Sequence, residues 1–305
     1  MRSNFGTLLI KVLVWPWSRL PLKVHYRISP VLAFLIGKVF RYRRDTVVLN
    51  IARAFPEKDI WDIDSEGLID RFYQHLADVF VEAVWFGGCG NRKRLHDARI
   101  VELVNPEEFT ALYAKSPDVM VLCSHQGNWE LSGGIESYNY TDKPFPVGWQ
   151  NVRITYREMS SKAWDGFFRD NRKAPTVNRD QFEGYIESKD IVRYVLEHAG
   201  SGFVYNFITD QRPYYKNSRN LRVSFMGQEC AAMSAGAALA HKTGMPVCFL
   251  SMPVESRGHY KYKYITICED ASKMSVQEIM DEYFRLLEDE IRRQPFNYLW
   301  SHRRW

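Results

Sequence analysis

The sequence lacks an uninterrupted apolar run of the roughly 18 residues that a helix needs to cross a bilayer. Lys11 and Pro16 interrupt the first apolar stretch, and Lys38 ends the second. No small-residue cleavage site follows the first stretch, so we expect no secretory signal peptide. These absences leave open whether the amino-terminal segment spans a bilayer, lies on it or docks to it.

Cysteine is scarce, and its spacing shows no pairing. The five cysteines are odd in number and far apart, at positions 89, 123, 230, 248 and 268. This pattern fits neither a disulfide framework nor the closely spaced pairs that bind zinc. We therefore expect free thiols, a reducing compartment and no metal site.

Acidic residues are nearly absent from the first 55 residues, where ten Lys or Arg face the single acid Asp45. Such a basic segment suits an anionic surface, either a lipid bilayer or a nucleic acid. The residues between the charges are aliphatic or aromatic, as in 12–15 and 31–36, and this favours lipid. We expect an anionic membrane surface as a partner and no nucleic acid.

The chain of 305 residues is long enough to bury a sizeable core, and its 46% hydrophobic and 25% charged residues indicate a globular protein. Strand-like and helical patterns alternate, which predicts an α/β fold with a mixed, largely parallel sheet flanked by helices. We expect strands over 118–122, 145–149, 152–156, 202–208, 245–250 and 262–267, and helices over 41–56, 64–86, 160–172, 186–199, 231–242 and 275–293.

Two apolar and basic helical segments are expected over residues 5–40, joined near Pro16 and Pro21. The co-occurrence of aromatic and cationic side chains favours contact with a membrane interface. The alternative is a pair of amphipathic helices that pack on the protein's own core. We divide the chain into a membrane-associating amino-terminal segment, residues 1–56, and a main domain, residues 57–305.

The decapeptide 123–132, Cys-Ser-His-Gln-Gly-Asn-Trp-Glu-Leu-Ser, follows the first buried strand of the main domain. Four residues separate His125 from Glu130, so on one ideal helix the two side chains would lie on different faces. They can meet only if His125 lies in a turn and Glu130 in the first turn of a helix. Glu130 would then hold one imidazole nitrogen and leave the other free to accept a proton.

The residues between them suit such a turn, because Gly127 tolerates unusual dihedral angles and Asn128 is a good helix N-cap. A helix N-terminus also favours negative charge, so the amides of residues 126–128 are expected near an oxyanion, and Asn128 near the substrate. The alternative is that His125 and Glu130 form an ordinary structural pair.

A second polar cluster, Asp210 and Gln211, follows the strand predicted over 202–208. Ligands of α/β folds bind at the carboxyl ends of the strands, and this cluster is therefore where a partner for the first cluster is expected. A simple N-cap is the alternative role for Asp210.

Residues 124–130 resemble the motif of histidine, four residues and an acid of the lysophospholipid acyltransferase superfamily. Further blocks, in order along nearly the whole chain, resemble the bacterial lipid A secondary acyltransferases. These blocks are Tyr156 with Trp164-Asp165 and Arg172, Thr209-Asp210-Gln211, Phe225-Met226-Gly227-Gln228, residues 242–247 and the terminal residues 300–305. Where this family usually has Asn, the second block has Ser161.

The resemblance implies transfer of a fatty acyl group from a thioester to a lipid hydroxyl, without a cofactor. His125 would be the general base and Glu130 its orienting acid, while Arg172, Asp210 and Gln211 would bind substrate. The donor implied is an acyl carrier protein thioester, with coenzyme A as the alternative, and the acceptor is a lipid A precursor or a related lysolipid. The implied location is the cytoplasmic face of the bacterial inner membrane.

Three other functions remain open from the sequence. A hydrolase would use the same His125 and Glu130 with water as the nucleophile, and a non-catalytic protein would keep the fold for membrane interaction. A metal site made of His125, Glu130 and Asp210 ranks below these, because no second histidine lies at ligand spacing. The terminal residues 302–304 would be a solvated tail or a site for anionic headgroups.

Overall fold

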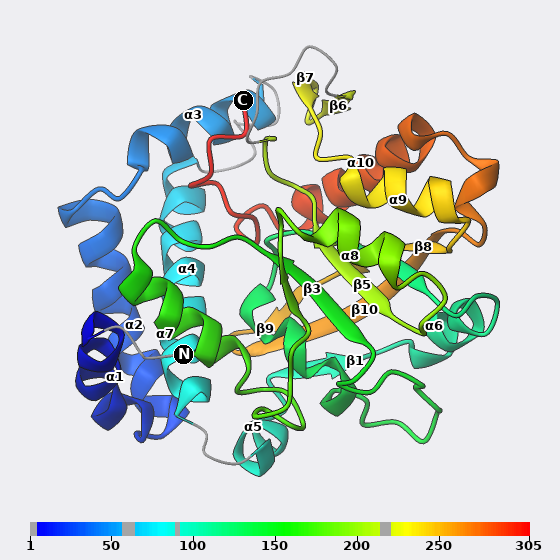
Figure 1. The fold of residues 1–305 in the computed structure, drawn as a ribbon. Coiled ribbons are helices and arrows are strands. Elements are labelled where there is room, and N and C mark those ends of the chain that lie inside the picture. The colour runs from blue at the N-terminus through cyan, green and yellow to red at the C-terminus, as the bar shows by residue number, and fades with distance from the viewer. Residues whose placement is uncertain (1–4, 57–64, 89–91, 214–220) are drawn as a thin grey trace.

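The computed structural model describes residues 5–56, 65–88, 92–213 and 221–305. A single large sheet crosses its centre, with strands in the order β1-β10-β8-β2-β5-β3-β4 and with β9 paired to β10 (Figure 1). The strands are β1 (Val101–Leu103), β2 (Val119–Cys123), β3 (Val152–Tyr156), β4 (Tyr185–Glu187), β5 (Val204–Ile208), β8 (Val247–Ser251), β9 (Val254–Ser256) and β10 (His259–Cys268).

The sheet is mixed and largely parallel. The neighbours from β8 through β2, β5 and β3 to β4 all run parallel, whereas β10 is antiparallel to β8. A separate antiparallel hairpin joins β6 (Arg222–Phe225) to β7 (Gln228–Ala231). The predicted fold class is therefore confirmed.

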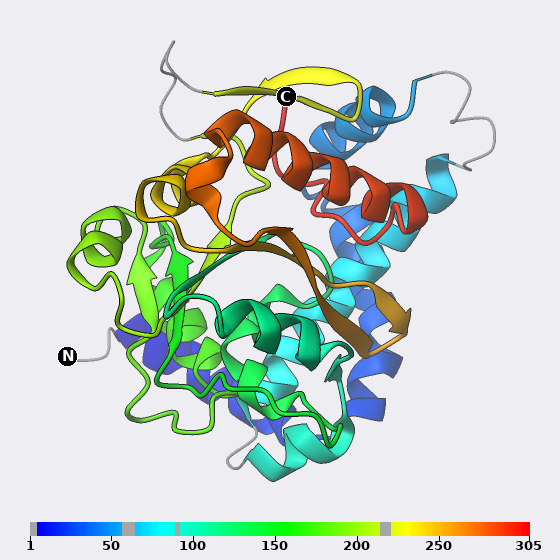
Figure 2. The ribbon, with the colours of Figure 1, turned by 90° about the vertical axis from the view of Figure 1, so that its right-hand side faces the viewer.

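Buried side chains cover both faces of the sheet, as the alternation along β2 illustrates. Met120 and Leu122 belong to a core shared with helices α8 (Ile191–Glu197), α9 (Ala235–Thr243) and α10 (Val276–Arg293). Val121 and Cys123 belong to a core shared with α5 (Arg92–Ala98), α6 (Pro106–Tyr113) and the 3₁₀ helix η2 (Trp129–Ser137). Figure 2 shows α10 and α6 on opposite sides of the strands. Burial on both faces explains why β2 reads as a continuous apolar run.

The helices follow the predicted periodicity in most places. They are α1 (Phe5–Ser18), α2 (Leu22–Phe34), α3 (Arg44–Ala54), α4 (Ser65–Gly87), α5 (Arg92–Ala98), α6 (Pro106–Tyr113), η2 (Trp129–Ser137), α7 (Lys162–Arg172), α8 (Ile191–Glu197), α9 (Ala235–Thr243), η3 (Ala271–Lys273) and α10 (Val276–Arg293). A π-helical turn, η1 (Leu35–Val39), extends α2. Ser275 and Glu278 form a capping box at the start of α10, and Gly244, at φ +72°, ends α9.

Three predicted elements differ from the structure. Residues 145–149 form no strand: Pro146 removes a backbone donor within this run, and only the following run pairs with β5. The helix predicted over 186–199 is only α8, since β4 takes the start of that range. Likewise, the small-residue helix predicted from residue 231 begins at Ala235, after β7.

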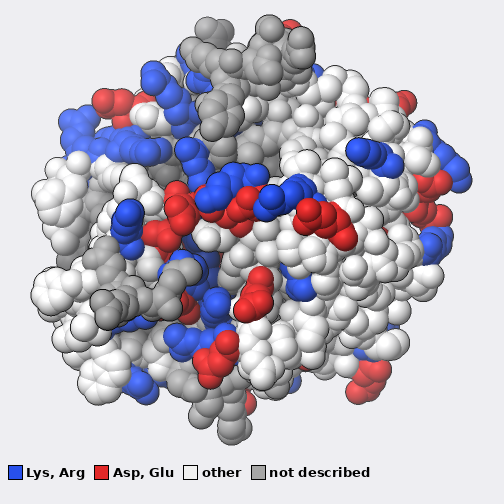
Figure 3. All heavy atoms as spheres, viewed as in Figure 1, with Lys and Arg blue, Asp and Glu red and all other residues white. Residues whose placement is uncertain are grey.

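The amino-terminal helices pack on the main domain through one side only. Helix α2 packs on α4, and α1 packs on α7. The other side is exposed and apolar: Leu13, Trp15, Val31 and Phe34 each expose more than half of their surface. In Figure 3 this side, at the lower left, is mostly free of charge, and Lys and Arg gather at the upper left, where α3 begins.

None of the described helices combines the length and the apolarity that crossing a membrane requires. Cys123, Cys230, Cys248 and Cys268 are free thiols. Cys89 lies outside the described residues. The predicted domain boundary, after residue 56, lies at the edge of a stretch outside them. The division into two domains stays a prediction.

Candidate active site

The sheet brings the two predicted polar clusters side by side. Strands β2 and β5 are parallel neighbours, and their last residues, Cys123 and Ile208, face each other in register. His125 and Asp210 each lie two residues beyond that pair. Parallel strands place their carboxyl ends at one edge of the sheet, so the two side chains meet even though 85 positions separate them in the sequence.

Asp210 holds both the ring and the backbone of His125. Its Oδ1 lies 2.8 Å from Nδ1 of His125, and its Oδ2 accepts the His125 backbone N–H at 3.1 Å. The Asp210 side chain is 2% exposed. Burial alone would raise its pKa, but the charge of His125 and the hydrogen bonds from it lower the pKa below its usual value. An ionised Asp210 makes Nδ1 the protonated nitrogen and leaves the lone pair on Nε2.

Gln211 and Trp129 complete the surroundings of the imidazole. The side-chain amide of Gln211 lies 3.2 Å from Nε2 of His125, and the Trp129 ring meets the imidazole edge-on at 5.3 Å between centroids. The His125 side chain is 15% exposed. The Gln211 amide therefore lies next to Nε2, the nitrogen that Asp210 leaves with a lone pair.

The predicted pairing of His125 with Glu130 is wrong. Glu130 lies in the first turn of η2. Its carboxylate receives two hydrogen bonds from the Arg172 guanidinium, at 2.6 and 2.8 Å, and one from Trp129 Nε1 at 3.2 Å. The 3₁₀ geometry directs Glu130 toward the end of α7 and away from the turn. The Glu130 charge raises the pKa of Arg172 against the opposing effect of burial.

Gly127 confirms the predicted turn, with φ at +55°. Its N–H donates to Oδ1 of Asn297 at 2.6 Å, so this amide is not available to an oxyanion, contrary to the prediction. A Cβ at position 127 would lie 2.8 Å from the Met252 carbonyl oxygen. Close packing and the left-handed conformation both require glycine here.

The side chain of Asn128, which we expected near the substrate, is completely buried. Its Nδ2 donates to Oε2 of Glu82 at 2.7 Å. Asn128 does occupy the N-cap position of η2, but its side chain makes no capping hydrogen bond.

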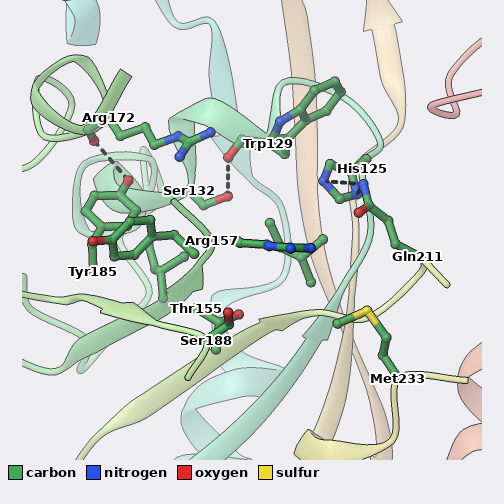
Figure 4. A pocket seen from close by; sticks show the side chains of 13 residues that line it. His125, Trp129, Ser132, Thr155, Arg157, Arg172, Tyr185, Ser188, Gln211 and Met233 are labelled. Carbon is green, nitrogen blue, oxygen red and sulfur yellow. Dashed lines mark hydrogen bonds between the residues drawn. The ribbon is translucent and has the colours of Figure 1, made fainter. Parts of the chain in front are cut away.

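A cavity of about 210 Å³ opens beside the Nε2 edge of His125 (Figure 4). Predicted site residues His125, Arg172 and Gln211 line it together with Trp129, Ser132, Ile154, Thr155, Tyr156, Arg157, Tyr185, Ser188, Ile208 and Met233. Our sequence reasoning missed Arg157, which follows the carboxyl end of β3 and lies across the cavity from Arg172. The strand-end rule that located Asp210 would also have located Arg157.

The carboxyl-terminal segment is part of the site's frame and not a solvated tail. Arg304 is 2% exposed, and its guanidinium lies between the rings of Phe225 and Phe284, at 5.3 and 5.2 Å from their centroids. Burial lowers the pKa of His302 to about 4. His302 is therefore neutral at pH 7 and does not compete with His125 for the charge of Asp210.

Within the described ranges, no group of three or more His, Cys, Asp or Glu side chains is arranged to hold a metal ion. The three candidate ligands are divided, because Asp210 holds His125 and Arg172 holds Glu130. The residues present fit proton transfer by a histidine with a buried carboxylate, beside a cavity that contains two arginines.

A model of the family described as bacterial lipid A biosynthesis acyltransferase matches residues 1–143 and 169–305. The chain belongs to this family. Membership implies acyltransferase activity in lipid A biosynthesis, and with it a lipid acceptor, an acyl donor and membrane association. A comparison with curated proteins gives no match.

The site of this family member divides into matched and unmatched parts. The match includes His125, Asp210 and Arg172, and it omits residues 144–168. The omitted stretch supplies one wall of the cavity, from Ile154 to Arg157. The proton-transfer pair thus lies in the matched part, and this wall lies in the part that the family model does not match.

Proposed function

We propose that the protein transfers a fatty acyl group from an acyl thioester to a hydroxyl of a lipid A precursor or related lysolipid, with His125 as the general base and Asp210 as the acid that orients it. The observation that carries this proposal is the 2.8 Å contact between Asp210 and Nδ1 of His125. It leaves Nε2 as a proton acceptor at the wall of a cavity.

In the proposed reaction Nε2 of His125 removes the proton from the acceptor hydroxyl as its oxygen attacks the thioester carbonyl carbon. The C–O bond forms, and the tetrahedral intermediate then expels the thiolate as the C–S bond breaks. The proton on Nε2 passes to the leaving sulfur, so His125 returns to its neutral form. Asp210 stabilises the imidazolium between these steps.

The oxyanion needs donors close to Nε2, and the described cavity offers side chains for this role. The Gln211 amide lies within 3.2 Å of the imidazole, and Arg157 extends across the cavity (Figure 4). We assign Gln211 and Arg157 to the oxyanion or to an anionic group of the acceptor. Arg172, fixed by Glu130 through two hydrogen bonds, presents its remaining N–H groups to substrate in a set orientation.

The residues from Ile154 to Arg157 form one wall of the cavity, and we assign acceptor selection to this wall. A phosphorylated glucosamine lipid would suit the two guanidinium groups of the cavity. The proposed donor is an acyl carrier protein thioester, since an acidic carrier suits a chain of net charge +5. Coenzyme A is the other candidate donor.

We propose that helices α1 and α2 attach the protein to an anionic membrane surface, at the cytoplasmic face of the inner membrane. Their exposed apolar side chains and the basic residues Arg41, Arg43 and Arg44 support this placement. Residues 1–56 would then be the membrane-associating segment and residues 57–305 the acyltransferase domain.

The test is an acyl-transfer assay in detergent micelles with acyl carrier protein thioester, lipid A precursor and purified protein. We expect acylated lipid from the wild type and a loss of about 10²–10⁴-fold for His125→Ala, because a general base is removed. His198→Ala is the matched control, since His198 bonds to its own helix at Tyr194.

Other results would point to the alternatives. Free fatty acid without acylated lipid would indicate a hydrolase. Full turnover by His125→Ala would contradict the assigned base. A membrane-interaction protein would bind lipid without turnover of any thioester, including those of coenzyme A.

A further inference from the structure

Glu82 is a completely buried carboxylate on α4 that the proposed reaction does not use. Three donors from three parts of the chain converge on it. Its Oε1 accepts the Tyr26 hydroxyl of α2 at 2.7 Å, and its Oε2 accepts the Asn128 amide at 2.7 Å and the Tyr260 hydroxyl of β10 at 2.9 Å. Burial of a carboxylate charge is costly unless hydrogen bonds of this kind compensate it. We therefore ask what this buried and fully bonded carboxylate does for the protein.

The contact with Asn128 connects Glu82 to the turn that carries His125. Asn128 follows His125 by three residues, and its carbonyl accepts the Tyr262 hydroxyl at 3.2 Å. With its side chain fixed by Glu82 and its main chain by Tyr262, Asn128 has no freedom to rotate. The turn between them contains Gly127, whose conformation would otherwise be the least restricted in the segment.

The contact with Tyr26 connects the same carboxylate to the amino-terminal helices. Tyr26 is wedged between α4 and the turn from β9 to β10, where the Arg257 guanidinium lies 4.9 Å from the centre of its ring. A Cβ on Gly258 would meet the Tyr26 hydroxyl at 2.1 Å. The position of α2 is therefore fixed where it meets Glu82.

We propose that Glu82 is a positioning residue that sets the His125 turn through Asn128 and couples that turn to α2 through Tyr26. This inference rests on the proposed acyl transfer. Glu82 neither lines the cavity nor bonds to His125, and it acts on the reaction through Asn128. A shift of the turn by about 1 Å would misplace Nε2 enough to cost about 10²-fold in rate.

Two substitutions of Glu82 separate positioning from charge. Glu82→Gln keeps an oxygen that accepts from Asn128 and Tyr260, and its amide donates to the Tyr26 oxygen, so kcat is expected to stay within about fivefold of wild type. Glu82→Leu has no acceptor, and kcat is expected to fall about 10²-fold with KM nearly unchanged. A purely structural role would lower the amount of folded protein in both variants and leave kcat per folded molecule unchanged.

The double variant Glu82→Leu, Asn128→Leu tests the route of the effect. If Glu82 acts through Asn128, the double variant loses no more activity than either single variant. Losses that multiply would overturn the proposal. Tyr26→Phe is expected to lower kcat about threefold, against no change for Tyr113→Phe, whose hydroxyl donates to Gly202 far from this cluster.

Amide hydrogen exchange at residues 124–130 tests the same inference without an activity assay. We expect at least tenfold faster exchange of these amides in Glu82→Leu than in wild type or Glu82→Gln, with exchange in α10 unchanged. Unchanged exchange in the turn would overturn the proposal. If the turn loosens as expected while wild type shows no acyl transfer, the proposed function fails and the positioning role stands.

Discussion

Arg172 and Glu130 show at the scale of single residues how one charge is kept in place by another. The Glu130 side chain is 7% exposed, and its two shortest hydrogen bonds both come from the Arg172 guanidinium. The pair lies at the cavity wall, so the orientation that Glu130 gives to Arg172 determines which N–H groups face a substrate.

Arg172→Met is expected to lower the free energy of unfolding by about 2–3 kcal/mol, because it leaves the buried Glu130 carboxylate without its cationic partner. The figure stays below the 3–5 kcal/mol of a fully buried pair, since the Arg172 side chain is 22% exposed. Chemical denaturation measures this loss. The double variant Arg172→Met, Glu130→Gln is the control and should recover part of it; a double variant less stable than the single one would contradict this account.

Glu82 makes stability depend on pH. Burial raises the pKa of Glu82 from 4.5 to about 7, although the hydrogen bonds from Tyr26, Asn128 and Tyr260 lower it. The charge of Asp78 adds to the rise. Arg257, on the β9–β10 turn, is a cation near Glu82. Because the folded state binds this proton more tightly, the stability that Glu82 contributes is fully present below pH 4.5 and is lost as the pH rises through 7.

The glutamine of Glu82→Gln does not titrate, so only the wild type loses the contribution of Glu82 as the pH rises. The difference in free energy of unfolding, variant minus wild type, should therefore increase by up to about 3 kcal/mol between pH 4.5 and 7 and then level off. Urea unfolding at several pH values measures the difference. Glu290→Gln, which removes a buried carboxylate on α10, is the control. A difference that stays constant across this pH range would contradict the buried, titrating Glu82.

At the scale of elements, the ends of β2 and β5 explain both what the sequence predicted and what it missed. The apolar runs and the polar residues after them located His125 and Asp210, because strand burial is readable locally. The sequence did not show whether Glu130 or Asp210 is the partner of His125, because this depends on which strands are neighbours and on η2 being a 3₁₀ helix. Spacing along the sequence favoured the nearer acid, and strand register selected the distant one.

The turn after β2 provides a test at this scale. Gly127→Ala would place a Cβ 2.8 Å from the Met252 carbonyl oxygen at φ +55°, so we expect both a loss of about 2 kcal/mol in stability and a fall in kcat of tenfold or more. Gly200→Ala is the matched control, because φ is +82° there and nothing lies within 4 Å of the added Cβ. Equal losses of activity in the two variants would contradict a special role of the turn.

At the scale of the whole molecule, the amino-terminal helices join an exposed apolar surface to the site. Helix α1 packs on α7, which carries Arg172, and α2 packs on α4, which carries Glu82. The sequence predicted the composition of this surface. It did not predict which side of each helix stays exposed, because that depends on contacts with helices far along the chain.

Leu13→Glu is expected to weaken binding to vesicles of anionic phospholipid by about tenfold or more, because it removes apolar area and adds repulsion. Leu13 is 63% exposed, so the fold should be unaffected. Val192→Glu, on the exposed side of α8, is the control, and vesicle sedimentation is the measurement. Equal binding by both variants would remove α1 from the proposed membrane surface.

The central claim is that Asp210, and not Glu130, orients the catalytic histidine. It is tested most directly by the single-turnover rate of acyl transfer in Asp210→Asn, measured at saturating lipid acceptor and thioester. The account predicts a fall of about 10³–10⁴-fold with little change in lipid binding, because an amide cannot hold Nδ1 protonated and stabilise the imidazolium. A rate within a few-fold of wild type would contradict it.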